Sequence, residues 1–308
     1  MNQYLQKKFP HLELSVLKLS EVQRDNESLI LGSNFNSNTR RKALQTLKSN
    51  NKVSDYFDLI STTISSITEP SYIYGLTHSL GNFLQDVDLT QDALGSNKKE
   101  VKENDFIISR LRSYLQEMAV IQTKNYKQLV STEYLVYRPK TNLLSSNTLM
   151  VFALSEIVQT ILNCSQYGTE HPRFYEFVFN ELPIPDCVFG LNYEIDSMLN
   201  KAYHTLEQSK VLYKEAETLL YVELGLDPAN PMQSILQSHS NNINFRIATL
   251  KESFLKTGRL DSEYYQVKYE RNEAMIKSKP YARLKDIVEI KKSIEPGSGR
   301  IEKVESPL

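Results

Sequence analysis

The sequence predicts an α+β fold, in which a mixed α/β domain is followed by long helices that are antiparallel or resemble a coiled coil. Residues 46–190 have a mixed texture, with short β-rich runs at 105–109 and 133–139. Residues 194–224 instead carry a narrow apolar stripe with helical spacing. The chain has 308 residues, 40% of them hydrophobic and 10% aromatic, which suffices to form a core.

A weak internal repeat divides the chain. Four positions near the start recur later in the same order and at nearly the same spacing. The period is far longer than the roughly 20–50 residues of a solenoid repeat, so we expect one full unit of domain size and the opening of a second. The matched pairs are Leu31 with Leu260, Phe35 with Tyr264, Asp55 with Asp286 and Leu59 with Ile290.

The helix predicted over 194–224 is set off by residues that end helices. Pro183 and Pro185 prevent a helix from running into it, and Gly225 stands where a C-terminal cap is expected. One interpretation is an ordinary buried helix. The narrow stripe favours another, a spacer that packs against a second long helix, either residues 232–256 or the same helix of a second copy. The stripe consists of Ile195, Leu199, Ala202, Leu206, Tyr213, Ala216 and Leu220.

Composition argues against several functional classes. The net charge is −1, so any nucleic-acid surface must be a local patch. The two cysteines have no metal spacing and no apolar run is long enough to span a membrane, which predicts a cytoplasmic protein. None of the five histidines has zinc-ligand spacing, and we find neither a Gly-rich phosphate loop nor a methyltransferase signature. We therefore expect no catalytic residue, no metal and no cofactor.

A basic segment is the first candidate binding surface. Residues 98–140 contain nine Lys or Arg and five Asp or Glu, a difference of +4. Such a cluster can neutralise phosphates, and arginine can also make a bidentate contact with guanine. An equally weighted interpretation is a solvated strand edge whose charges maintain solubility. The candidate DNA contacts in this segment are Arg110, Arg112, Tyr114, Lys124, Lys127 and Lys140.

The polar loop at 165–173 is a second candidate surface. Glycine, proline and polar side chains predict a surface loop after an apolar, helix-like stretch at 147–163. Its side chains are of types that reach base edges or phosphates, although a plain turn explains the loop equally well. The candidates are Gln166, Thr169, His171 and Arg173.

Several segments, taken in order, resemble the specificity subunits of type I restriction–modification systems. No single segment is decisive, but the ordered set spans about residues 100 to 298 and is specific, whereas the N-terminal part matches more loosely. The segments are Ile107–Leu115, Val130–Pro139, Gly168 with Pro172 and Arg173, Leu182–Pro185, Ala216–Leu226, Arg259–Tyr265 and Ile287–Ser298.

The resemblance implies a function and a set of partners. Such subunits are not enzymes; they take part in defence against phage by reading DNA sequence. Each target-recognition domain reads one half of a split site in double-stranded DNA, and long helices set the gap and dock methyltransferase subunits. S-adenosylmethionine is then expected on the partner methyltransferase. The implied domains are a connector at 1–45, a recognition domain at 46–190, a helical spacer at 191–228, a second helical segment at 229–280 and the start of a truncated second recognition domain at 281–308.

The chain departs from the full pattern of the family, because only one recognition domain is complete. A subunit of this kind would have to form a homodimer to read a split site, and the target would then have two-fold symmetry. Two alternatives remain open at this stage. The chain could be a fragment of a fused restriction–methylation enzyme, or a protein-binding helical scaffold without a DNA role.

Overall fold

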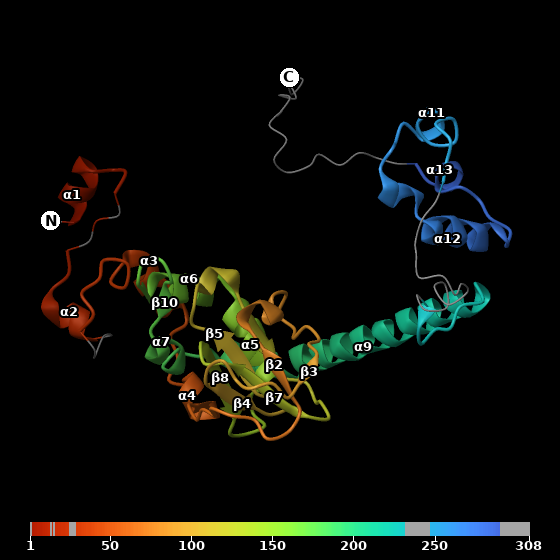
Figure 1. Ribbon diagram of the computed structural model, residues 1–308. Helices are drawn as coiled ribbons and strands as arrows, with labels where there is room; N and C mark the ends of the chain where they lie inside the picture. Colours follow the sequence, from red (N-terminus) through yellow and green to blue (C-terminus); the bar gives the residue numbers. More distant parts are fainter. Residues whose placement is uncertain (1, 13, 15, 25–28, 232–246, 290–308) are drawn as a thin grey trace. The chain divides into compact units, whose positions relative to one another are not determined.

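The computed structural model confirms the α+β fold (Figure 1). The chain divides into two compact units, residues 1–205 and 206–308. The structure describes residues 2–12, 14, 16–24, 29–231 and 247–289.

Two four-stranded sheets form the centre of the first unit, with strand orders β1-β8-β5-β6 and β3-β2-β7-β4. All pairs are antiparallel except β2 with β7. The strands expected at 105–109 and 133–139 are confirmed as β5 and β8. The strands are β1 (Phe57–Ile60), β2 (Ser71–Tyr74), β3 (Leu89–Thr90), β4 (Lys98–Val101), β5 (Phe106–Ser109), β6 (Met118–Val120), β7 (Lys127–Ser131) and β8 (Tyr134–Pro139).

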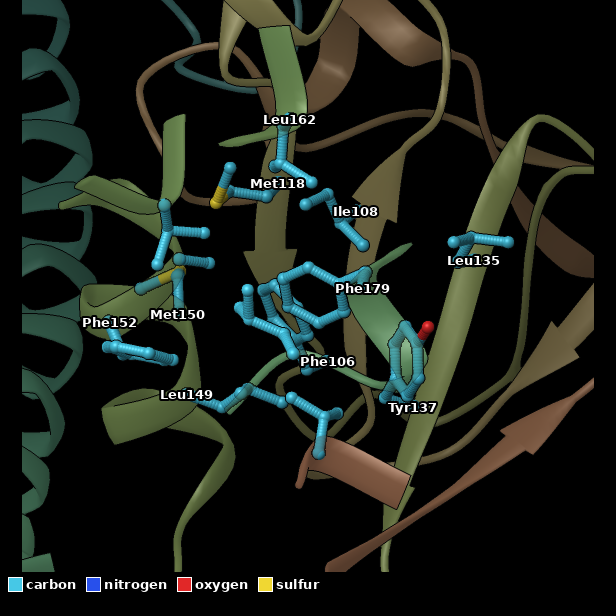
Figure 2. Close-up of a cluster of buried hydrophobic side chains, with 14 of the residues drawn as sticks. Phe106, Ile108, Met118, Leu135, Tyr137, Leu149, Met150, Phe152, Leu162 and Phe179 are labelled. Atoms are coloured by element: carbon cyan, nitrogen blue, oxygen red, sulfur yellow. The ribbon is translucent and has the colours of Figure 1, made fainter. Parts of the chain in front are cut away.

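The β5 strand is buried along its whole length because both faces of its sheet are covered. Successive side chains of a strand point to opposite faces. Phe106 and Ile108 therefore join the core beneath the helices, whereas Ile107 joins a second core with Val136 of β8 and residues of the other sheet. Figure 2 shows the first core, where the ring of Phe106 lies 5.8 Å from that of Phe179 between centroids. A strand buried on both faces reads as a continuous apolar run.

Helices with serine caps cover the first sheet. Ser145 Oγ accepts a hydrogen bond from the Thr148 amide at 3.1 Å, and Ser155 separates two helices that bend by 71°. The predicted helical stretch at 147–163 is thus two helices. Within the described residues, no single helix is long and apolar enough to cross a membrane. The remaining elements are α1 (Asn2–Lys8), α2 (Leu19–Arg24), α3 (Asn38–Thr46), α4 (Val53–Tyr56), η1 (Leu76–Ser79), η2 (Ser113–Leu115), α5 (Ser146–Leu154), α6 (Glu156–Cys164), β9 (Gln166–Tyr167), β10 (Arg173–Phe174), α7 (Glu176–Asn180) and α8 (Asp186–Gly190).

The long helix predicted over 194–224 is confirmed as α9 (Asn192–Glu223), a single element in Figure 1. At about 1.5 Å per residue it is roughly 48 Å long. None of its residues is buried within the described structure, and the choice between an ordinary buried helix and a spacer stays a prediction. Of the predicted stripe, Ile195, Leu199 and Leu206 are half-buried, and the other four residues are exposed. The candidate partner helix at 232–256 lies largely outside the described residues.

Gly225 ends α9 as the sequence predicts. Its φ is +73°, its amide donates to Val222 O at 2.9 Å, and the Leu226 amide donates to Tyr221 O at 2.9 Å. This pair of bonds is a Schellman motif, which satisfies the last carbonyls of a helix.

The variant Gly225→Ala is expected to weaken this helix end by about 1 kcal/mol, because a Cβ disfavours the left-handed conformation. A Cβ at this position would meet no atom within 4 Å, so the cost is one of backbone conformation alone. Amide hydrogen exchange at residues 225 and 226 measures this weakening, and exchange should be faster in Gly225→Ala than in wild type. Gly190→Ala is the control, since that glycine also has open space and no positive φ. Equal exchange in both variants would contradict this account of the cap.

The beginnings of the two predicted repeat units have similar local structure. The Lys18 amide donates to Glu21 Oε2 at 2.7 Å, and in the second half the Thr249 amide donates to Glu252 Oε2 at 2.9 Å. The number of residues between the start of α3 and the start of α12 equals the number between Leu31 and Leu260. The number between the starts of α4 and α13 equals the number between Asp55 and Asp286. Such agreement supports a duplication. Beyond α9, the described elements are α11 (Phe254–Thr257), η3 (Ser262–Tyr265), α12 (Val267–Lys277) and α13 (Leu284–Ile287).

The expected boundaries at 45, 190, 228 and 280 stay predictions. Phe35, in the predicted connector, is 3% exposed and packs in the same core as α5 and α6. Most of the predicted start of a second recognition domain, residues 290–308, lies outside the described residues.

Candidate functional site

The structure brings together two loops that are far apart in the sequence. The first follows β5 and contains η2, and the second joins β9 to β10. Their backbones are hydrogen-bonded: the Arg112 amide donates to Pro172 O at 2.8 Å, and the Phe174 amide donates to Arg110 O at 3.1 Å. We call residues 109–117 and 165–174 the paired loops. They hold seven of the ten predicted contact residues, namely Arg110, Arg112, Tyr114, Gln166, Thr169, His171 and Arg173.

Arg112 is held in an unusual conformation. Its φ of 49° and ψ of 60° place it in the left-handed region, where the backbone of any residue other than glycine is strained. A guanidinium N–H donates to His171 Nδ1 across the two loops at 3.2 Å, which requires that this nitrogen carry no proton. Within the described part of the chain, no ion pair joins Arg112 to a carboxylate. Its positive charge is therefore available for an anionic ligand.

Glu133, at the turn between β7 and β8, organises the other two arginines. Arg173 donates to both of its carboxylate oxygens, at 2.9 and 2.6 Å, and Arg110 lies 3.9 Å away. The hydrogen bonds from Arg173 lower the pKa of Glu133 most, with further lowering by the charge of Arg110. Two guanidinium groups share one carboxylate, so the triad carries one net positive charge. A bidentate arginine has a fixed plane and few remaining rotamers.

Polar side chains inside the paired loops hold η2 in place. Ser113 Oγ donates to Asn163 Oδ1 at 2.6 Å, and Gln166 Nε2 donates to the same oxygen at 3.2 Å and to Ser113 Oγ. Gln166 therefore positions the first loop, whatever else it contacts. Thr169 lies in the exposed tip of the second loop.

Glu117 ends the first loop as a buried acid, 6% exposed. Burial raises the pKa of its carboxyl above the ordinary value of 4.5, although a hydrogen bond with Ser109 and the charge of Arg112 partly offset this. Among the residues that the structure describes, its Oε2 has no hydrogen-bond partner. Ionisation of Glu117 is thus less favourable in the folded chain than in water.

The pH dependence of stability should show this cost. Because the folded pKa of Glu117 lies above the unfolded one, wild type loses stability as pH rises from about 4.5 through the folded pKa. Glu117→Gln removes the loss, so its free energy of unfolding should rise relative to wild type over that window. Glu133→Gln is a control of opposite sign. Because the folded pKa of Glu133 is lowered, its carboxylate stabilises the folded chain at pH values above the unfolded pKa, and the variant loses that contribution. Denaturant titrations across pH measure both, and a Glu117→Gln difference that does not change with pH would contradict the assignment.

The three predicted lysines lie outside the paired loops and are ion-paired. Lys124 pairs with Asp86 at 2.8 Å, Lys127 with Glu69 at 2.7 Å and Lys140 with Asp58 at 3.3 Å. Lys140 follows the opposite end of β8 from Glu133, about 20 Å along the strand. Their role in binding DNA stays a prediction.

Two further cations of the basic segment have internal partners. Lys99 is 7% exposed and donates to Tyr134 O at 2.9 Å, and Arg138 forms a bidentate pair with the buried Asp105. The excess of +4 therefore overstates the positive surface. Sequence reasoning also missed Glu133, Ser113 and Asn163, since their importance comes from long-range contacts that no local pattern signals.

No protein-family model matches the chain, and no curated protein matches it. Among solved structures, the chain is similar to one described as the structural basis of complex assembly and conformational transition of the type I R-M system, with 18% sequence identity and a TM-score of 0.40. It is also similar to the HsdS subunit from Thermoanaerobacter tengcongensis, with 14% identity and a TM-score of 0.36. Each match covers 56% of this chain and 47% of the other, so the chain spans about half the length of these structures.

Proposed function

We propose that the chain is a non-catalytic DNA-specificity subunit that recognises one half of a split target in double-stranded DNA. The observation that carries the proposal is the convergence of Arg110, Arg112 and Arg173 on the paired loops. The ordered sequence motifs that resemble type I specificity subunits support it independently. Arginine and histidine side chains on loops held by a sheet are suited to contact phosphates and base edges.

The roles of the three arginines follow from how each is held. Arg112, with no carboxylate in contact among the described residues, is suited to a phosphate or to a guanine edge. Arg173 is fixed by Glu133 and keeps the second loop in place, and Arg110 lies beside the same carboxylate. Side chains that read DNA sequence bind more tightly when their geometry is fixed before binding. The contacts of Arg173 and Arg110 with Glu133 provide that preorganisation.

We further propose that α9 sets the distance between two recognition units and docks a methyltransferase. Its C-terminal half exposes apolar side chains, among them Leu212 at 64%, Tyr213 at 78% and Leu219 at 62%. The partner methyltransferase, not this chain, would bind S-adenosylmethionine. Two copies joined through α9 would read a two-fold related site, and the mass of the protein in solution tests that arrangement.

Band shifts with duplex DNA of random sequence, at low and high salt, test the proposal. We expect binding by the full-length chain, alone or with a methyltransferase, that weakens steeply with salt because bound phosphates release counterions. Absence of salt-sensitive binding under both conditions would contradict a DNA role and would favour a protein-binding scaffold.

A further inference from the structure

The short turn η2 exposes an apolar pair in the middle of the polar paired loops. Tyr114 is 58% exposed and Leu115 is 40% exposed. Ser113 before the pair and Glu117 shortly after it are 5% and 6% exposed. The two apolar side chains thus project from a base that is itself buried.

This turn is rigid and its backbone is strained. Left-handed residues flank it on both sides: Arg112, and Gln116 with φ 53° and ψ 37°. The Leu115 amide donates to Arg112 O at 2.8 Å, and Asn82 Nδ2 donates to Gln116 O at 2.9 Å. Strain of this kind persists only where the surroundings fix it, and it occurs most often at functional sites.

From this geometry we propose that Tyr114 and Leu115 form a wedge that enters a base step of the bound duplex. This inference rests on the proposed DNA-binding function and adds how the site engages its ligand. Proteins that deform DNA insert apolar side chains between base pairs, which unstacks one step and kinks the helix. A wedge must be stiff, because a mobile side chain would yield before the bases separate, and η2 has the required support.

Charge favours DNA over protein as the occupant. Arg112 adjoins the wedge in sequence and forms no ion pair with a carboxylate of the described residues, while the nearby triad of Arg110, Arg173 and Glu133 carries one net positive charge. Cations beside an apolar projection suit a base step, because phosphate backbones flank every step. Pyrimidine–purine steps unstack most easily, so the wedge also selects sequence at a step where it forms no hydrogen bond.

The test uses duplexes selected from a random-sequence pool by repeated binding to the full-length chain. The fluorescent adenine analogue aminopurine replaces each adenine in turn, and its emission rises where a base is unstacked. We expect a rise at one pyrimidine–purine step with wild type. Tyr114→Ala should abolish it and weaken binding about tenfold, the loss expected for one aromatic stack, whereas Tyr114→Phe should retain it.

Leu115→Ala should reduce the same signal, and Tyr193→Ala, an exposed tyrosine on α9, should leave it unchanged. Binding without a local rise at any step would overturn the wedge and leave the proposed function standing. If wild type selects no duplex, the proposed function fails and the wedge fails with it. If Tyr114→Ala binds DNA like wild type but no longer assembles with a methyltransferase, η2 is a protein contact and the wedge is wrong.

Discussion

The double variant Arg110→Ala with Arg112→Ala is expected to weaken duplex binding by about 2–6 kcal/mol, because each arginine contact with DNA contributes roughly 1–3 kcal/mol. The plot of log affinity against log salt should also become shallower by about one for each of the two arginines that contacts a phosphate. The fold should persist, because Arg173 still pairs with Glu133 through two hydrogen bonds. Fluorescence anisotropy of labelled duplex at several salt concentrations measures both effects.

A matched control removes the same charge elsewhere. Lys210→Ala with Lys277→Ala removes a half-buried lysine from α9 and an exposed lysine from α12, each of which forms an ion pair within its own helix. We expect this variant to bind DNA alone with nearly the affinity and salt slope of wild type. Equal losses in both double variants would mean that net charge, not the paired loops, determines binding.

Removing the ring of Phe106 is expected to destabilise the first unit strongly. Phe106 is fully buried, and its ring lies near those of Phe179 and Tyr137, with centroids at 5.8 and 6.4 Å (Figure 2). Phe106→Ala leaves a cavity and should cost about 3–5 kcal/mol in the free energy of unfolding. Urea denaturation followed by far-ultraviolet circular dichroism measures the loss.

Two companion variants sharpen this comparison. Phe106→Leu keeps most of the buried volume and should lose clearly less stability than Phe106→Ala. Tyr193→Ala removes an aromatic side chain that is 83% exposed, and should change stability by no more than about 0.5 kcal/mol. A loss below about 1 kcal/mol for Phe106→Ala would show that the aromatic cluster around Phe106 contributes little to the stability of the first unit.

The elements with a strong local signal could be predicted from sequence. The regular stripe from Ile195 to Leu220 predicts α9, and Gly225 predicts its end, because helix spacing and a left-handed cap are properties of a short segment. Strands β5 and β8 are visible for a similar reason: burial on both faces leaves continuous runs of apolar residues.

The paired loops could not be derived in the same way. Their contacts join residues far apart in the chain, such as Arg112 with His171, and sequence spacing carries no information on such pairs. Charge counting was also misleading, because Arg138 neutralises the buried Asp105. Residue type indicates which side chains could bind DNA, but only the fold distinguishes an arginine paired with a carboxylate from Arg112, which has no such ion pair among the described residues.

The most direct test of the central claim is a comparison of affinities at one fixed salt concentration. The full-length chain, alone and with a methyltransferase subunit of the proposed complex, is titrated with a duplex recovered by selection and with a scrambled duplex of the same composition. A specificity subunit should bind the selected duplex at least about 10³-fold more tightly. Equal affinities for the two duplexes would contradict the claim that this chain reads DNA sequence.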